Sequence, residues 1–384
     1  MSRFIIELRG VEFHNKGAEL MLHAILERVR QDFPEALFVM EQRESAPVHK
    51  QRELGIYTKM NYRKFGVNSA IWGTMLPAKV RHKLGYMLEK EINIVFDGSG
   101  FAFGDFWGAK KAGDRLADHI IRWKAEGKKI IMLPQAFGAF TDLKLRDKMK
   151  TVLDHADLVF ARDKYSFEYL QGLEGEKSCI GLRPDFTNLI KGKLPKDFDS
   201  SKYQVAIIPN NKLLESSVFQ NRTEYVEFLK NVCNLILSKG KIPFFLIHEG
   251  VKDLRLAEEV NQTFLLDIPI LKEDNPLHVK GIIGTVDAVI TSRFHGLVSA
   301  LAQAVPCLCV GWSHKYLALM EDYDYSEGLL RDSELKGNEM LQDKIHMILD
   351  NESAQQVRKK LEQNSTKQKQ LANEMWNLVF NTIN

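Results

Sequence analysis

The amino-acid sequence predicts an α/β protein with two doubly wound, Rossmann-like domains that face a cleft. Short apolar runs alternate with helical patterns along most of the 384 residues. Such runs are typical of parallel strands that are buried on both faces of a sheet. A polar stretch with Gly, Pro and Ser, residues 191–202, interrupts the alternation once before it restarts. Since domains usually have about 100–200 residues, the length and the interruption together predict two domains.

In the first half, apolar runs predict strands over 4–8, 37–40, 92–96, 129–133 and 158–161. The spacing of apolar residues predicts helices over 17–30, 112–126, 142–154 and 164–170. We expect Pro134 to end the fourth strand, because proline interrupts regular structure. Residues 1–190 are therefore expected to form the N-terminal domain, followed by the linker 191–202.

In the second half, apolar runs predict strands over 204–208, 242–247, 287–291 and 307–310. Helical spacing predicts helices over 225–239, 254–262, 296–303 and, at the end of the chain, about 355–381. We expect residues 203–345 to form the C-terminal domain and 346–384 to form helices that follow it. In such sheets ligands bind beyond the carboxyl ends of the strands, so the candidate residues are sought there.

Composition excludes several classes of protein. The chain has 53 Lys and Arg against 50 Asp and Glu, a net charge of +3, which argues against a dedicated nucleic-acid binder. No apolar run is long enough for a membrane span or a signal peptide. The four cysteines form no C-x-x-C pair, and Cys307 and Cys309 are expected to be buried thiols in a reducing, cytoplasmic protein. We expect no metal and no cofactor, because no ligand cluster, dinucleotide fingerprint or phosphate-binding loop occurs.

The strongest candidate for chemistry follows the strand predicted over 287–291. Arg293 and His295 stand between this strand and a helix that begins near Gly296. Helix N-termini attract anions, Arg offers a two-pronged donor, and His titrates near neutral pH. These residues predict an anion site with an acid or base beside it. The structural alternative is that Arg293 pairs with a carboxylate and His295 caps the helix.

Other strand ends carry weaker signals. Lys315, after the strand 307–310, is a candidate anion ligand, or else a solvated lysine that opens a surface helix. Arg162 ends the strand 158–161 and is a candidate cleft residue, or else a local partner of Asp163. Six further residues are expected to line the cleft, each with an ordinary structural role as the alternative: Asn15, Asp97, Ser99, Gln135, His248 and His314.

Taken in order, these motifs resemble those of the polysaccharide pyruvyl transferase family, over about residues 4–315. The matching positions are 15–19, 97–101, 134–135 and 138, 162–163 and 166, 184–185, 248, 293–295, 306 and 314–315. Two departures are Ser99 between Gly98 and Gly100, where the family often has three glycines, and Gly296, where it often has alanine. The resemblance implies a fold like that of GT-B glycosyltransferases, with the acceptor on the N-terminal domain and the donor on the C-terminal one.

The resemblance also implies an activity, the transfer of a pyruvyl group from phosphoenolpyruvate to two hydroxyls of a sugar, as a ketal. Arg162, Arg293, His295, Lys315 and the backbone of Phe294 would then form the donor site. Phosphoenolpyruvate carries two anionic groups, which the two arginines suit, and His295 is the expected catalytic acid and base. The alternatives are a nucleotide-sugar glycosyltransferase on the same fold and a non-catalytic sugar-binding relative.

One segment departs from the even charge balance. Residues 57–90 hold seven Lys and Arg, among them Lys59, Arg81 and Lys83, against one acid, Glu89. The segment interleaves these charges with five aromatic residues: Tyr57, Tyr62, Phe65, Trp72 and Tyr86. The apolar residues within 78–89 have helical spacing, which predicts either an interfacial helix on an anionic membrane or a core-packed helix with a solvated basic face. A membrane-bound enzyme could meet a lipid-diphosphate-linked sugar there.

Overall fold

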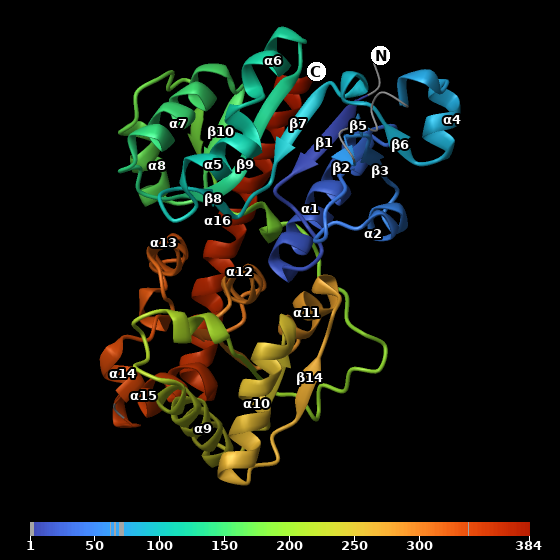
Figure 1. Ribbon diagram of the computed structural model, residues 1–384. Helices are drawn as coiled ribbons and strands as arrows, with labels where there is room; N and C mark the ends of the chain where they lie inside the picture. Colours follow the sequence, from blue (N-terminus) through green and yellow to red (C-terminus); the bar gives the residue numbers. More distant parts are fainter. Residues whose placement is uncertain (1–3, 62, 65–66, 69–72, 337) are drawn as a thin grey trace. The chain divides into compact units, whose positions relative to one another are not determined.

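The computed structural model describes residues 4–61, 63–64, 67–68, 73–336 and 338–384, which form two compact units (Figure 1). Unit 1 comprises Met1–Asp185 and Glu374–Asn384, and unit 2 comprises Phe186–Asn373. The long helix α16 (Asn351–Ile383), red in Figure 1, starts in unit 2 and ends in unit 1. No helix among the described residues is long and apolar enough to cross a membrane.

Unit 1 is built on a sheet that has nine strands within the described ranges, in the order β11-β10-β9-β7-β1-β2-β3-β6, with β8 paired to β9. The strands are β1 (Ile5–Arg9), β2 (Leu37–Glu41), β3 (Ile56–Lys59), β6 (Tyr86–Met87), β7 (Ile94–Asp97), β8 (Phe101–Phe103), β9 (Lys129–Phe137), β10 (Leu158–Ala161) and β11 (Ile180–Leu182). Neighbouring strands are parallel, which confirms the predicted class. A separate antiparallel pair joins β4 (Arg63–Lys64) to β5 (Val67–Asn68).

Helices cover both faces of this sheet. On one face, Arg30 of α1 (Lys16–Asp32) lies over the ring of Phe38, and Trp376 of α16 packs on Phe96. On the other face, Trp123 joins one core cluster with Val39 and other strand residues. The helices of unit 1 are α1, α2 (Val48–Glu53), α4 (Ala78–Lys83), α5 (Gly108–Ala112), α6 (Ile120–Ala125), α7 (Leu143–His155) and α8 (Lys164–Gln171).

Unit 2 is built on a parallel sheet of five strands within the described residues, in the order β14-β13-β12-β15-β16. The strands are β12 (Val205–Ile208), β13 (Pro243–Ile247), β14 (Ile270–Lys272), β15 (Ala288–Thr291) and β16 (Cys307–Cys309). Alternate residues of β12 enter different core clusters, so the sheet is buried on both faces as its apolar runs predict. Cys307 and Cys309 are buried free thiols, as predicted.

The helices of unit 2 follow the strands in turn. They are α9 (Arg222–Ser238), α10 (Gly250–Phe264), α11 (Pro276–Ile283), α12 (Phe294–Ala302), α13 (His314–Asp322), α14 (Asp332–Lys336), α15 (Asn338–Leu349) and most of α16. Single-turn 3₁₀ segments occur at η1 (Glu89–Glu91), η3 (Phe186–Asn188), η4 (Asn211–Glu215) and η5 (Ser326–Gly328).

Two predicted boundaries in unit 1 were wrong. Pro134 does not end its strand, since β9 continues to Phe137. The pairing of β10 with β9 shifts between Val159 and Ala161. This irregularity accommodates Pro134, because proline has no backbone N–H to donate to the neighbouring strand. The helix predicted over 112–126 is divided into the end of α5, a π-helical turn at Gly113–Ala117 and α6.

The helix predicted within 78–89 was also wrong in its extent. Helix α4 has six residues and ends before Gly85, whose φ of +79° suits a turn rather than a helix. Val80 and Leu84 are exposed, whereas Arg81 and Lys59 are buried and ion-paired. The segment is therefore not a uniform basic face. Tyr62, Phe65 and Trp72 of the predicted surface lie outside the described residues.

Candidate active site

The turn that follows β15 lies at the point in the unit 2 sheet where the strand order reverses. Strand β12 pairs with β13 on one side and with β15 on the other, so the connections diverge at the carboxyl ends of β12 and β15. Such switch points are where open α/β sheets bind ligands. Arg293 stands at this point, and Phe294 and His295 begin helix α12, whose N-terminus favours anions.

Hydrogen bonds fix the shape of this turn. The carbonyl of Ser292 accepts from Asn210 Nδ2 at 2.9 Å and from the Tyr316 hydroxyl at 3.0 Å. The backbone N–H of Arg293 donates to Thr291 Oγ1 at 3.0 Å. Asn210 is held in turn by Tyr225, whose hydroxyl accepts the Asn210 N–H at 3.0 Å. Burial raises the pKa of Tyr225 to about 12, so this hydroxyl keeps its proton.

Gly296, one of the departures from the family pattern, is required by close packing here. A Cβ at this position would lie 2.8 Å from Thr291 Oγ1 and 3.3 Å from Ile208 Cδ1. Thr291 is the residue that accepts the Arg293 N–H, so a bulkier side chain would disturb the turn. The glycine therefore preserves the position of Arg293.

Arg293 is held by two carboxylates of the neighbouring element. Its Nε donates to Asp253 Oδ2 at 3.1 Å, Nη2 donates to the same oxygen, and Nη1 donates to Glu249. The structural alternative for Arg293 is thus confirmed in this structure. Three of the five guanidinium N–H bonds are used, which leaves one on each Nη without a hydrogen bond among the described residues. Burial raises the pKa of Asp253, and the charge of Arg293 opposes that rise.

The other residues predicted in unit 2 gather around this turn. The Lys315 ammonium lies 5.3 Å from the ring centroid of Phe294, 4.7 Å from that of Trp312 and 5.5 Å from that of Tyr316. The rings of Phe294 and His295 meet edge to face at 5.6 Å. His314 is the first residue of α13. His248 is buried at the end of β13, directly before Glu249.

A second set of predicted residues lies together in unit 1, at the carboxyl ends of β7 and β9. Asp97 Oδ1 accepts from the Ser99 N–H at 3.1 Å and from Gln135 Nε2 at 3.2 Å, and all three residues are buried. Asp97 Oδ2, Ser99 Oγ and Gln135 Oε1 have no hydrogen bond among the described residues. Asn15 is the N-cap of α1, where its Oδ1 accepts the Ala18 N–H at 3.0 Å.

Arg162 belongs to this second set. Its backbone N–H donates to Gln135 O at 3.0 Å, and its Nη1 lies 3.3 Å from Asp185 Oδ2, with both side chains buried. The predicted alternative, a pair with Asp163, was wrong, because Asp163 caps α8 by accepting from Ser166. The structure thus brings Arg293, Phe294, His295 and Lys315 together in unit 2 and places Arg162 in unit 1.

Asp253 was not among the residues predicted from the sequence. Its signal is the spacing of Glu249 and Asp253, four residues apart at the beginning of a helix that follows a buried strand. Such residues share one face of the helix and meet the next strand end of the sheet. Among the described residues no group of three or more His, Cys, Asp and Glu side chains could hold a metal ion.

Several solved structures are similar to this chain over nearly its whole length. Anabaena Alr3699/HepE, solved in complex with UDP and glucose, is similar with a TM-score of 0.56 and 12% identity, over 99% of this chain and 100% of that one. A glycosyltransferase from Rickettsia africae has a TM-score of 0.57 and 11% identity, over 100% and 99% of the two chains. UDP-glucose: anthocyanidin 3-O-glucosyltransferase, in complex with UDP, has a TM-score of 0.54 and 10% identity, over 100% and 99%.

At such low identity these similarities bear on the fold, and they confirm the predicted GT-B class with two Rossmann-like units. No curated protein matches the sequence significantly. A family model described as polysaccharide pyruvyl transferase matches residues 15–314, which include the turn at Arg293 and the cluster at Asp97.

Proposed function

Because the chain belongs to the polysaccharide pyruvyl transferase family, we propose that it moves the pyruvyl group of phosphoenolpyruvate onto two hydroxyls of one sugar residue. The products are a cyclic pyruvate ketal and phosphate. The observation that carries this proposal is the turn at 293–295, where a fixed guanidinium, a helix N-terminus and an imidazole occupy one strand end of unit 2.

The proposed reaction balances without a cofactor. His295 protonates the methylene carbon of phosphoenolpyruvate, and C2 becomes an oxocarbenium-like centre that the first sugar hydroxyl attacks. The bond between C2 and the phosphate oxygen then breaks, and the second hydroxyl closes the ketal. The two sugar hydroxyls release two protons. One returns to His295 in place of the proton that His295 gave to the methylene carbon, and the other leaves with phosphate. Such general acid–base catalysis typically contributes about 10²–10⁴-fold in rate.

The donor site would use the chain's cations for the two anionic groups of the donor. Arg293 keeps one N–H on each Nη for an anion, and its other N–H groups hold it in place through Asp253 and Glu249. Lys315 supplies a point charge next to Phe294, and the N-terminus of α12 adds backbone donors. Arg162 would take the second anionic group, and Asn15, Asp97, Ser99, Gln135, His248 and His314 are proposed to bind the acceptor or to line its approach.

We further propose a cytoplasmic enzyme that meets a lipid-linked acceptor at the inner face of a membrane. Four apolar residues in and beside α4 are exposed: Met75, Leu76, Val80 and Leu84. Lys79 and Lys83 are exposed on the same short helix. An exposed apolar patch flanked by lysines favours an anionic lipid surface.

A donor test separates this function from its alternatives. Phosphoenolpyruvate is expected to raise the melting temperature of the protein, and UDP-glucose is not. The reverse result would favour a nucleotide-sugar glycosyltransferase. Phosphate release from phosphoenolpyruvate that depends on an added glycan would exclude a non-catalytic sugar-binding protein, and no release with any glycan would contradict the proposal.

A lipid test addresses the membrane contact. The protein is expected to sediment at low salt with vesicles of phosphatidylglycerol and phosphatidylcholine, but not with pure phosphatidylcholine. Leu84→Asp should abolish this binding, whereas Leu237→Asp, at an exposed leucine of α9, should not. Equal sedimentation of the two variants would contradict the proposed surface.

A further inference from the structure

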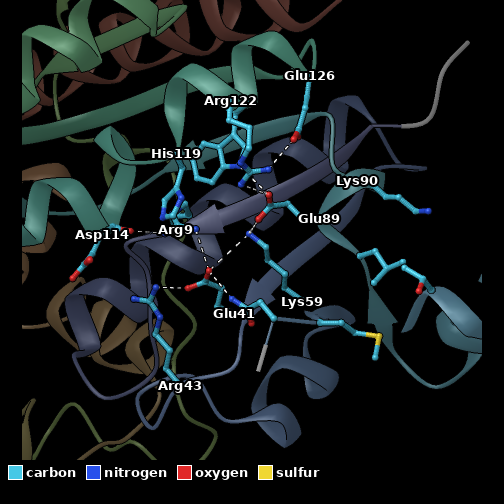
Figure 2. A pocket seen from close by; sticks show the side chains of 15 residues that line it. Arg9, Glu41, Arg43, Lys59, Glu89, Lys90, Asp114, His119, Arg122 and Glu126 are labelled. Carbon is cyan, nitrogen blue, oxygen red and sulfur yellow. Dashed lines mark hydrogen bonds and ion pairs between the residues drawn. The ribbon is translucent and has the colours of Figure 1, made fainter. Parts of the chain in front are cut away.

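A pocket of about 650 Å³ lies over a face of the unit 1 sheet, and its lining includes none of the donor or acceptor residues proposed above. Its floor includes Arg9, Glu41 and Lys59, the last residues of β1, β2 and β3. Glu41 pairs in register with Lys59, and Arg9 with Asp97, so charges of opposite sign alternate along the carboxyl edge of the sheet. Residues of α6 and of η1 form its walls (Figure 2).

The charges beneath this pocket are unusually well buried. Glu7, Arg9 and Lys59 are at most 5% exposed. Lys59 Nζ lies 2.9 Å from Glu7 Oε2 and 2.8 Å from Glu89 Oε2, and Arg9 Nη1 lies 2.6 Å from Glu7 Oε1. Replacement of such a buried network by apolar side chains is often neutral or stabilising, so folding alone gives no reason for it. A role in binding would give one.

The lining of the pocket selects against several kinds of ligand. Five Lys or Arg side chains and four carboxylates line it among the described residues, and all nine are labelled in Figure 2. Pockets for apolar molecules are lined mainly by hydrophobic side chains, which is not the case here. A phosphate or a nucleotide would meet four carboxylates as well as the cations. The lining therefore favours a ligand without net charge.

A hydroxyl-rich ligand satisfies this lining best. Each hydroxyl can donate to a carboxylate and accept from an ammonium or a guanidinium, so it can bridge the ion pairs without breaking the charge balance. His119 stacks on Trp123 with ring centroids 5.1 Å apart, which adds a flat ring surface to one wall. Burial and the charges of Arg9 and Lys59 lower the pKa of His119, so its neutral ring can also accept a hydrogen bond.

We propose that this pocket binds a neutral sugar unit of the acceptor glycan. The proposal rests on the proposed function only in identifying the sugar as part of the acceptor. It gives the acceptor a binding site in unit 1 that shares no side chain with the donor residues. Three rim positions suit its test: exposed Lys90, exposed Glu126, and half-buried His119 on Trp123.

The experiment uses the full chain, labelled with a fluorophore, on a printed array of neutral and acidic microbial glycans. The wild type is expected to bind neutral glycans, and His119→Ala, Lys90→Ala and Glu126→Ala are each expected to weaken binding at least tenfold. Thr74→Trp, which keeps every charge but fills space beside the exposed Thr74, should have the same effect. Lys129→Ala, at a half-buried lysine outside the pocket that pairs with Asp157, is the matched control and should bind like the wild type.

The donor-site variant Arg293→Lys separates the two proposals. It should lose pyruvyl transfer and keep wild-type binding on the array. A second outcome is that the pocket variants weaken glycan binding but the wild type does not turn over phosphoenolpyruvate. That outcome would contradict the proposed function and still support the sugar pocket. Binding that the pocket variants leave unchanged, or binding of acidic glycans alone, would overturn the sugar pocket whatever the activity.

Discussion

Asp253 accepts hydrogen bonds from both Nε and Nη2 of Arg293 through a single carboxylate oxygen. This bond fixes the plane of the guanidinium at the carboxyl end of β15, while Asp253 Oδ1 accepts the Asn211 N–H at 2.9 Å. Asp253 thus joins the strand ends of β12 and β15 through α10. In the proposed reaction it is a positioning residue, because it acts on the donor through Arg293.

Asp253→Asn tests this positioning role. The amide oxygen can still accept the Asn211 N–H, but the amide group would no longer hold the guanidinium by charge. A misplaced group of this kind costs up to about 100-fold in rate, so we expect kcat/KM for phosphoenolpyruvate to fall by about 10- to 100-fold. Asp267→Asn, at an exposed aspartate, is the control. An unchanged KM and kcat with a lowered melting temperature would show that Asp253 is only structural.

Lys315 is expected to bind the donor as a point charge. Its ammonium lies among the rings of Phe294, Trp312 and Tyr316, beside the turn that carries His295. Lys315→Met should raise the KM for phosphoenolpyruvate at least tenfold, and Lys315→Arg should restore most of the affinity because it keeps the charge. Lys252→Met, at an exposed lysine of α10, should have no effect. Steady-state kinetics in which Lys315→Met matches the wild type would remove Lys315 from the donor site.

The stability of the protein should depend on acid pH through Glu41 and Glu89. Burial raises the pKa of each, but the nearby cations, Arg9 and Lys59 for Glu41 and Lys59 and Arg122 for Glu89, outweigh it and lower both values to about 2. A carboxylate whose pKa is lowered on folding contributes its full stabilisation when the pH is above its unfolded pKa of 4.5. This contribution is lost progressively as the pH falls toward 2. These groups should therefore change the free energy of unfolding little between about pH 7 and 5. Below a pH of about 4.5 the free energy of unfolding should decrease.

Denaturant titrations between pH 7 and 3 measure this dependence. Glu89→Gln should flatten it, and Glu258→Gln, at an exposed glutamate, should not. A wild-type stability that stays constant down to pH 3 would contradict the assigned ion pairs.

Glu7 is expected to be the carboxylate on which the buried network depends. It lies within hydrogen-bond distance of both Arg9 and Lys59. Glu7→Gln removes the shared negative charge from two buried cations, and loss of one partner of a buried pair costs about 3–5 kcal/mol. Urea unfolding should show a loss of this size, whereas Glu27→Gln, at an exposed position of α1, should show almost none.

A combined variant distinguishes the structural role of this network from its binding role. Glu7→Leu with Arg9→Met and Lys59→Met should recover most of the lost stability, because no buried charge is left unpaired. The same variant should not bind neutral glycans. A combined variant that still binds them would mean that the buried charges have no part in the sugar pocket.

The strands and the turn at Arg293 could be predicted because each is encoded locally. The apolar run of β15 and the change to helical spacing at α12 are adjacent in the sequence, and so are Arg293 and His295. The extent of β9 could not be predicted, since Pro134 is tolerated only through the irregular pairing of β10 with β9. The six-residue length of α4 likewise depends on the turn at Gly85.

The pocket proposed to bind a sugar could not be predicted for a different reason. Arg9, Glu41 and Lys59 each end a separate strand, and each alone looks like an ordinary polar residue after an apolar run. Only the register of three parallel strands brings them together, and the sequence does not specify that register. The same holds for Asp253 and Arg293, which lie 40 positions apart in the chain.

The most direct test of the account is mass detection of a pyruvyl group added to a glycan when the full chain is incubated with phosphoenolpyruvate. The wild type should give this product together with phosphate. His295→Ala should lose about 10²–10⁴-fold of the rate while still binding glycans, and His49→Ala, at an exposed histidine of α2, should not. Product formation by His295→Ala at the wild-type rate, or no pyruvylated glycan from the wild type, would contradict the account.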